Sequence, residues 1–216
     1  MEDIDQRIAR ACERAGRSVT EVVLVAATKT VPLQLIERAY NAGIRHFGEN
    51  RVQEAKGKIE AIDSMVRSGS TWHMLGHLQT NKVNSALRLF DVVQSIDSVK
   101  LAKVLNEHLD HELPILLEVN MGEESGKTGL SANQLPDVLD RIAEFSHLQV
   151  QGLMAMGPLV GDPEESRPFF RKARLLRDSL GLKQLSMGMT NDFEVAIEEG
   201  ATMVRIGRAI FGKRSY

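Results

Sequence analysis

Eight short apolar or β-branched runs alternate along the 216-residue chain with stretches whose apolar residues have helical spacing. The runs cover residues 22–26, 44–47, 71–75, 91–94, 115–119, 150–154, 184–187 and 202–206. A strand followed by a helix, at about 25–30 residues per unit, is typical of parallel βαβ units, and eight such units can close a barrel. We therefore predict an α/β fold, a single (β/α)8 TIM-type barrel. An open doubly wound sheet is the alternative, but no glycine-rich dinucleotide fingerprint follows the first run.

The stretches between the runs carry apolar faces and start signals that predict helices. The four clearest faces are Leu33, Ile36 and Tyr40; Leu101, Leu105 and Leu109; Leu135, Val138 and Ile142; and Phe169, Ala173, Leu176 and Leu180. Ser131 with Gln134 has the spacing of a capping box, and Asn191 with Glu194 has the same spacing. We expect residues 1–216 to form one domain, with residues 1–20 as an N-terminal helix packed on the barrel.

Charge and composition narrow the class of protein. A formal net charge of −2, with no stripe of Lys and Arg, argues against a protein that neutralises nucleic-acid phosphates. The lone cysteine, Cys12, cannot form an internal disulfide, which favours a reducing compartment. The charged N-terminus lacks the apolar core of a secretory signal, and the longest apolar run, residues 22–27, is far shorter than the roughly 20 residues that span a bilayer. We expect a cytoplasmic protein that binds neither membrane nor nucleic acid.

Small and polar residues follow the predicted strands, where a parallel barrel carries its chemistry. They include Thr28, Lys29, Thr30, Glu49, Asn50, Gly76, His77, Ser95, Asp97, Asn120, Gly157, Gly188, Thr190, Gly207 and Arg208. Lys29 is the leading candidate, because it ends a run that reads as a buried central strand and so places an amine at the barrel mouth. A partly desolvated amine near other cations is available to form a Schiff base. The alternative is an ordinary solvated lysine in a loop.

The last two predicted strands end in segments that suit an anion. Small residues around Ser186 and Gly207 let backbone N–H groups approach a phosphate, and a helix is expected to open near residues 190–192 with its N-terminus toward the rim. Thr190 adds a hydroxyl, while Gly207 and Arg208 add N–H groups and a cation. Each segment alone reads as an ordinary βα turn. Together they predict a phosphate cradle, because the final two strands are where barrels often bind phosphate.

Nine motifs, in order from about residue 22 to residue 214, resemble those of a known family. They are AATKT (26–30), HFGENRVQE (46–54), WHMLGHLQTNK (72–82), SIDS (95–98), EVN (118–120), SGKTG (125–129), GLMAM (152–156), LSMGMT (185–190) and VRIGRAIFG (204–212). Each motif alone is weak, but nine in sequence order are specific. The chain is similar to the pyridoxal phosphate homeostasis proteins of the YggS/PROSC type.

The resemblance implies a fold-type III barrel related to the N-terminal domain of alanine racemase, without that enzyme's C-terminal β-domain. It implies that the cofactor is pyridoxal 5′-phosphate (PLP), held as an internal aldimine on Lys29. By the same likeness Arg205 would face the pyridine nitrogen and keep it unprotonated. Asn50 would lie on the ring side of the pocket.

The resemblance also assigns the phosphate end of the cofactor. Thr190, Gly207 and Arg208 would contact the phosphate, with Ser186 nearby. One residue departs from the family pattern, because many relatives carry Thr or Ser where Arg208 stands. A hydroxyl contact to the phosphate would then be replaced by a backbone or guanidinium contact.

Missing catalytic groups favour a carrier over an enzyme. Racemisation needs a base on each face of the substrate Cα, and in alanine racemase the second base is a tyrosine from the C-terminal domain. The two tyrosines here are Tyr40, on an apolar helical face, and Tyr216, the last residue. His77, after the third predicted strand, is the best remaining titratable group. An arginine at the pyridine nitrogen also weakens carbanion stabilisation compared with a carboxylate.

We therefore expect a non-catalytic protein of intracellular PLP and vitamin B6 homeostasis that holds PLP on Lys29. It would supply or buffer PLP for PLP-dependent apo-enzymes, and we expect a monomer without a metal site. Two alternatives stay open. One is a slow PLP-dependent amino-acid racemase or lyase, and the other is a regulatory interaction protein that senses PLP.

Overall fold

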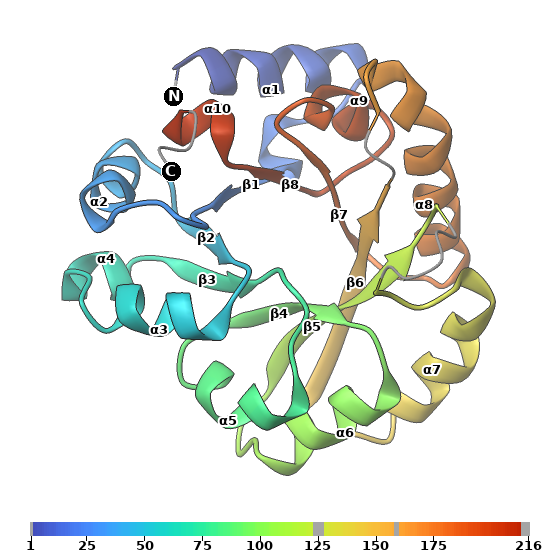
Figure 1. The fold of residues 1–216 in the computed structure, drawn as a ribbon. Coiled ribbons are helices and arrows are strands. Elements are labelled where there is room, and N and C mark those ends of the chain that lie inside the picture. The colour runs from blue at the N-terminus through green and yellow to red at the C-terminus, as the bar shows by residue number, and fades with distance from the viewer. Residues whose placement is uncertain (1, 123–127, 158–159, 213–216) are drawn as a thin grey trace.

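The computed structural model describes residues 2–122, 128–157 and 160–212 and shows a closed parallel barrel (Figure 1). Each strand pairs with the next one in sequence, and β8 closes the barrel on β1. The strands are β1 (Val23–Ala27), β2 (His46–Glu49), β3 (Thr71–Met74), β4 (Val92–Ile96), β5 (Leu113–Asn120), β6 (Leu148–Met156), β7 (Gln184–Met189) and β8 (Met203–Ile206). The predicted barrel is confirmed, and the open-sheet alternative is wrong.

Helices connect the strands and form the outer layer around the barrel (Figure 1). They are α1 (Glu2–Arg14), α2 (Leu33–Asn41), α3 (Val52–Ile59), α4 (Ser64–Ser68), α5 (Val83–Ala86), α6 (Val99–Glu107), α7 (Leu135–Ile142), α8 (Arg167–Ser179), α9 (Phe193–Glu198) and α10 (Arg208–Phe211). Short 3-10 helices are η1 (Val19–Glu21), η2 (Thr80–Lys82), η3 (Ala132–Gln134) and η4 (Pro163–Ser166). Within the described ranges, no helix combines the length and apolar character that crossing a bilayer requires.

Most strand residues are apolar because the strands are covered on both sides, by helices outside and by one another inside the barrel. Val25, Leu75, Leu116, Met154 and Met203 form a buried cluster inside the barrel. A larger apolar core contains the strand side chains that point outward together with the inward faces of the helices. Because side chains alternate across a strand, this double burial explains why the sequence shows continuous apolar runs rather than strict alternation.

Two helix signals can be compared directly with the structure. The capping box at the start of η3 is present, since Gln134 Oε1 accepts a hydrogen bond from the Ser131 N–H at 2.9 Å. In α8, however, Phe170 is buried with Ala173, whereas Phe169 is only half-buried. Both phenylalanines lie about one turn before Ala173, and helical spacing alone does not choose between them.

The second predicted capping box, Asn191 with Glu194, is wrong. Asp192 is the N-cap of α9, and no side-chain cap bond is made to the first helical turn. Asp192 Oδ1 instead accepts a hydrogen bond from the Met189 N–H at 2.7 Å and so closes the turn after β7. The competing carboxylate one residue later displaces the expected cap.

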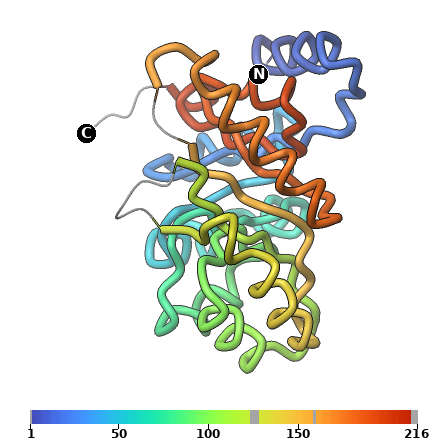
Figure 2. Tube along the Cα trace, turned by 90° about the vertical axis from the view of Figure 1, so that its right-hand side faces the viewer, coloured from blue at the N-terminus to red at the C-terminus, as the bar shows by residue number. Residues whose placement is uncertain are grey.

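Helix α1 lies against α9, beside the last elements of the chain (Figure 2). The Arg17 guanidinium, just beyond α1, donates to the carbonyl oxygens of Ile197 at 2.9 Å and Ala201 at 2.8 Å. The Arg7 guanidinium lies 4.5 Å from the centre of the Phe193 ring. Bonds from arginines to carbonyl groups at a helix end stabilise that end, so this N-terminal segment braces the loop that leads into β8.

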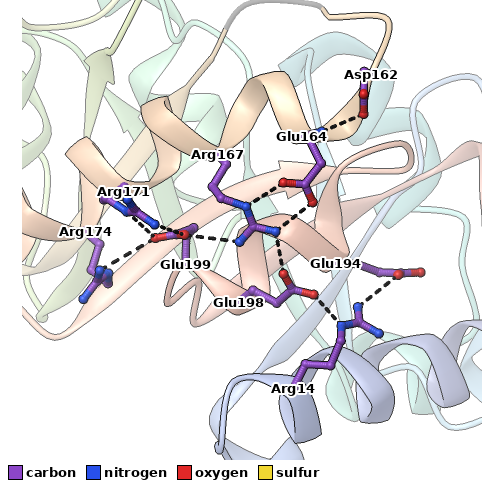
Figure 3. A network of polar contacts seen from close by, with 9 residues as sticks. All are labelled: Arg14, Asp162, Glu164, Arg167, Arg171, Arg174, Glu194, Glu198 and Glu199. Carbon is purple, nitrogen blue, oxygen red and sulfur yellow. Dashed lines mark hydrogen bonds and ion pairs between the residues drawn. The ribbon is translucent and has the colours of Figure 1, made fainter.

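An ion-pair network joins α1, α8 and α9 (Figure 3). Arg167 contacts Glu198 at 2.7 Å and Glu199 at 3.2 Å, and Arg14 contacts Glu198 at 2.6 Å. Burial would raise the pKa of Glu199, but hydrogen bonds from Arg171 and Arg167 outweigh that effect and lower it. The carboxylates therefore stay ionised at neutral pH and hold the three helices together on one side of the barrel.

Candidate cofactor site

The predicted rim residues lie on one continuous arc of the barrel mouth. Thr190 directly follows β7, and Gly207 and Arg208 directly follow β8. Lys29 lies two residues after β1, and Asn50 directly follows β2. Because β7, β8, β1 and β2 are consecutive neighbours in the barrel, these loops meet at the same rim.

Lys29 occupies a tight turn after β1. Its side chain is half-buried, and within the described ranges no hydrogen bond or ion pair engages its amine. Thr28, before it, is fully buried and donates its hydroxyl to Glu49 Oε1 at 2.7 Å. Thr30, after it, has a φ of 62°, in the left-handed region. A threonine there is strained by about 1–2 kcal/mol, so neighbouring contacts have to hold the turn.

Glu54 and Lys58 of α3, which we call the α3 clamp, supply those contacts. Glu54 Oε1 accepts the Thr30 N–H at 2.5 Å and the Lys58 ammonium at 2.7 Å. The same ammonium donates to the Thr28 carbonyl oxygen at 2.6 Å and to Glu49 Oε1 at 2.8 Å. Burial raises the pKa of Glu49, with the Lys58 hydrogen bond opposing it. The clamp fixes the main chain on both sides of Lys29.

The α3 clamp is a feature that was not predicted from the sequence. Its detectable signal is the i, i+4 spacing of Glu54 and Lys58, which pairs charges along one helix face. The same spacing occurs at Lys56 and Glu60, whose ion pair is exposed and reaches no loop. Spacing alone therefore could not separate a clamp on the Lys29 turn from a surface pair.

Asn50 is exposed, and its main chain is pressed against Gly76, after β3. A Cβ placed on Gly76 would lie 2.3 Å from the Asn50 carbonyl oxygen. Only glycine allows such an approach, so this contact sets where Asn50 stands on the rim. Its predicted place beside the cofactor ring stays a prediction.

The predicted phosphate side combines two loops. Helix α10 begins directly after Gly207, and the N–H groups of its first turn have no acceptor within the helix. Arg208 is exposed, and its guanidinium lies 3.4 Å from Asn191 Oδ1 in the turn after β7. Thr190 is half-buried in that same turn. The structure thus places these residues on adjoining loops, and their contacts with a phosphate stay predictions.

Arg205 and Ser186 lie inside the barrel rather than on the rim. Arg205 is 8% exposed, and its Nη1 donates to Ser186 Oγ at 2.7 Å while Nη2 donates to the Ala155 carbonyl oxygen at 3.2 Å. Burial lowers the pKa of Arg205 to about 10, against opposing effects of Asp192 and Glu118. The guanidinium therefore remains charged at neutral pH. Ser186 binds Arg205, and its predicted place near the phosphate stays a prediction.

A line of hydrogen bonds continues from Ser186 across the barrel interior. Ser186 Oγ and Gln94 Oε1 are 2.6 Å apart, Gln94 Nε2 and His73 Nδ1 are 3.0 Å apart, and His73 Nε2 and His46 Nδ1 are 3.0 Å apart. We call Arg205, Ser186, Gln94, His73 and His46 the interior row. Gln94 and both histidines were not predicted as site residues from the sequence. Each of these polar side chains lies within a barrel strand, and a polar residue in a strand that is covered on both sides could have indicated polar contacts inside the barrel.

A second polar group lies on the other side of the mouth. His77 is half-exposed, and its Nδ1 lies 2.8 Å from Asp97 Oδ2. Glu118 is buried and accepts a hydrogen bond from the Thr128 hydroxyl at 2.7 Å. Burial raises the pKa of Glu118, and that hydrogen bond opposes the rise.

In the part of the chain that the structure describes, no three His, Cys, Asp or Glu side chains gather to hold a metal ion. Residues 125–127 of the SGKTG motif and Tyr216 lie outside the described residues.

Comparison with known proteins shows the family to which the chain belongs. Residues 1–215 match the family model described as alanine racemase, N-terminal domain. A pyridoxal phosphate homeostasis protein of Aquifex aeolicus (strain VF5) is 43% identical over 220 residues, which covers 98% of this chain and 95% of that protein. The chain belongs to the family of pyridoxal phosphate homeostasis proteins.

Two solved structures have a similar fold. PipY of Synechococcus elongatus PCC7942, solved with PLP bound, is 35% identical with a TM-score of 0.82, covering 97% of this chain and 100% of that chain. An alanine racemase of Clostridium difficile 630 has a TM-score of 0.71 at 10% identity, covering 99% of this chain and 57% of that chain. At that identity the second likeness shows the shared barrel alone.

Proposed function

We propose that the chain binds PLP covalently through the amine of Lys29 and holds it in the cytoplasm for PLP and vitamin B6 homeostasis, without a reaction of its own. The observation that carries this proposal is the position of Lys29. Its half-buried amine, unengaged within the described ranges, stands on the same arc as the loops after β7 and β8. The names of the relatives and the PLP bound to PipY support the same ligand.

The groups on this arc fit each end of PLP. A primary amine suits the aldehyde carbon, and the N–H groups of α10 with the Thr190 hydroxyl suit a phosphate. Arg205, charged at neutral pH, suits the ring nitrogen, to which it would donate a hydrogen bond. PLP supplies an electron sink when it is bound. A guanidinium donor keeps the ring nitrogen unprotonated, and an unprotonated nitrogen weakens that sink.

The described residues support a carrier rather than a racemase. Tyr40 lies on α2 in the outer layer, with the Arg45 guanidinium 4.1 Å from the centre of its ring. His77 is half-exposed and hydrogen-bonded to Asp97. Neither has the arrangement of a base held against a substrate Cα opposite Lys29. We extend the proposal to a monomer that passes PLP to PLP-dependent apo-enzymes.

The test of this proposal is the linkage to Lys29. Addition of PLP should give a yellow protein with an absorbance band near the visible edge, and borohydride should fix the cofactor on the peptide that contains Lys29. Lys29→Ala should abolish both. Lys56→Ala, which removes an exposed lysine on α3, is the matched control and should change neither. An unchanged band in Lys29→Ala, or an adduct on another peptide, would overturn the proposal.

A further inference from the structure

The interior row connects five strands across the barrel and ends at the arginine expected beside the cofactor. His46 lies on β2, His73 on β3, Gln94 on β4, Ser186 on β7 and Arg205 on β8. The bond between Gln94 and Ser186 spans the barrel, since β4 and β7 are not neighbours (Figure 1). All of these side chains except His46 are at most 8% exposed. A buried polar row of this length is costly unless every member is paired, and here every link is made.

The chemistry of the end residue fixes the direction of every bond. A guanidinium only donates, so Ser186 Oγ accepts a hydrogen bond from Arg205 and its hydroxyl donates one to Gln94 Oε1. Gln94 then presents its amide nitrogen, which donates to His73 Nδ1. His73 must carry its proton on Nε2 and donate it to His46 Nδ1. The row therefore has one direction, away from Arg205, with both histidines in the neutral Nε2–H form.

The electrostatic surroundings agree with two neutral imidazoles. Burial lowers the pKa of His73 to about 3, with a smaller effect of His46, and burial also lowers the pKa of His46. Both N–H groups of the Gln94 amide have a partner, because the first points to His73 Nδ1 and the second to Met203 Sδ at 3.6 Å. Each member that donates onward becomes a better acceptor for the member before it. The whole row thus strengthens the bond that Ser186 accepts from Arg205.

We propose that the interior row is a positioning device for Arg205, with Gln94 as its central positioning residue, and that it sets how the guanidinium meets the ring nitrogen of PLP. This proposal rests on the proposed function, in which that nitrogen faces Arg205. The row lies inside the barrel, so Gln94 and the two histidines would influence PLP only through Ser186 and Arg205. They are positioning residues and do not bind the cofactor.

The direction of the row can be measured without any cofactor. In the unaltered chain at neutral pH, the ¹⁵N resonances of His46 and His73 should show both rings as the neutral Nε2–H tautomer. A protonated His73, or a proton on its Nδ1, would overturn the one-way row. This measurement decides the first part of the proposal whether or not the protein binds PLP.

The effect on the cofactor is tested by comparing PLP with 1-deazapyridoxal 5′-phosphate, whose ring carries C–H in place of the nitrogen. The unaltered protein should bind PLP more tightly than the analogue. Gln94→Leu should shrink that preference about fivefold, which is the worth of one hydrogen bond near 1 kcal/mol, and should shift the absorbance band of bound PLP. Met154→Leu is the matched control, because it alters the same interior cluster at a side chain that makes no hydrogen bond to the row, and it should keep the preference.

The outcomes separate this proposal from the function on which it rests. If the unaltered protein binds no PLP, the proposed function fails, while the ¹⁵N result still judges the row. If PLP binds and Gln94→Leu weakens PLP and the analogue equally, or Met154→Leu shrinks the preference as much, the positioning role is wrong and PLP binding stands. Should Gln94→Leu fail to fold, Ser186→Ala breaks the row one link closer to Arg205 and should shrink the preference in the same way.

Discussion

At the scale of single residues, burial decides which side chains carry charge inside this barrel. Arg205 keeps its proton although it is buried, because even a lowered pKa of about 10 lies well above neutral pH. His73 gives up its proton for the same physical reason, since desolvation penalises the charged form of both groups. Because the guanidinium stays charged beside neutral side chains, Arg205 donates at one end of the row and each later member accepts from the one before it.

The buried His73 predicts how stability depends on pH. Burial lowers its folded pKa to about 3, whereas an unfolded histidine titrates near 6.5. Below about pH 6.5 the unfolded chain therefore binds a proton that the folded chain does not. The free energy of unfolding should fall as the pH falls from 7 to 5, at up to about 1.4 kcal/mol per pH unit from this residue.

Denaturant unfolding at pH 7 and pH 5 checks this slope. His73→Asn does not titrate and keeps a carbonyl acceptor for Gln94, so its stability should depend on pH less steeply than that of the unaltered protein. His46, whose pKa is also lowered by burial, lies 3.0 Å from His73 between ring nitrogens, so His46→Asn measured alongside separates its share of the slope. Equal slopes in the two proteins would show that His73 is not held neutral.

Thr190 carries a prediction about the phosphate end of the cofactor. A hydroxyl that donates to a phosphate contributes roughly 1–2 kcal/mol, so Thr190→Val should weaken PLP binding by about that amount. Equilibrium titration with PLP and with pyridoxal, which lacks the phosphate, measures the loss. Pyridoxal should bind far more weakly and should not respond to the substitution. Equal losses for the two ligands would place Thr190 away from the phosphate.

Residues differ in how far their roles could be predicted from sequence. Lys29 could be predicted as a rim residue, because it comes two residues after an apolar run that is typical of a central strand. The role of Gln94 could not be predicted, because its partners lie on other strands. Ser186 is 92 positions away in the sequence, and His73 is 21 positions away. Ser186 can be predicted from the sequence to lie near the phosphate, whereas its bond to Arg205 is visible only in the folded barrel.

At the scale of elements, helix α3 controls the turn that presents Lys29. The α3 clamp holds the Thr30 N–H and the Thr28 carbonyl oxygen, on the two sides of the lysine. We expect Glu54→Ala to weaken PLP binding by about 1 kcal/mol, because the strained turn loses the hydrogen bond that fixes it. Glu54→Gln should keep most of the affinity, since its amide oxygen can still accept from Thr30. PLP titration of the two variants measures the difference.

The control for this prediction lies on the same helix. Glu60→Ala breaks the exposed pair between Lys56 and Glu60, both more than half-exposed, and should leave PLP affinity unchanged. If Glu60→Ala weakened PLP binding as much as Glu54→Ala does, both substitutions would act by destabilising helix α3 rather than by releasing the turn at Lys29. Unchanged affinity in Glu54→Ala would mean that the clamp does not position Lys29.

Strands and helices were predictable to different degrees. All eight strands follow from the apolar runs, because burial on both faces leaves few polar residues within them. Helix boundaries depend on local competition that the pattern does not resolve. Asp192 takes the cap position expected of Asn191, and Phe170 takes the buried position expected of Phe169. Helix α3 has two equally spaced charge pairs, Glu54 with Lys58 and Lys56 with Glu60. Only the folded structure shows that the first pair reaches the turn that contains Lys29.

At the scale of the whole molecule, the barrel places a reactive amine, an anion-binding side and a buried cation around one mouth. Lys29 offers one base to a substrate Cα, and general base catalysis contributes typically 10²–10⁴-fold per group. Racemisation needs a second base on the opposite face. His77, held by Asp97 at the mouth, is the titratable residue that could supply it. The carrier proposal therefore depends on His77 not acting in that way.

Solvent deuterium incorporation at Cα of alanine and other amino acids tests this central claim most directly. The PLP-loaded protein should exchange the Cα proton orders of magnitude more slowly than about 1 s⁻¹, a rate typical of enzymes, and His77→Ala should exchange it equally slowly. Such exchange is background chemistry of bound PLP. A rate constant of about 1 s⁻¹ or more that His77→Ala abolishes would contradict the carrier proposal and identify the protein as an enzyme.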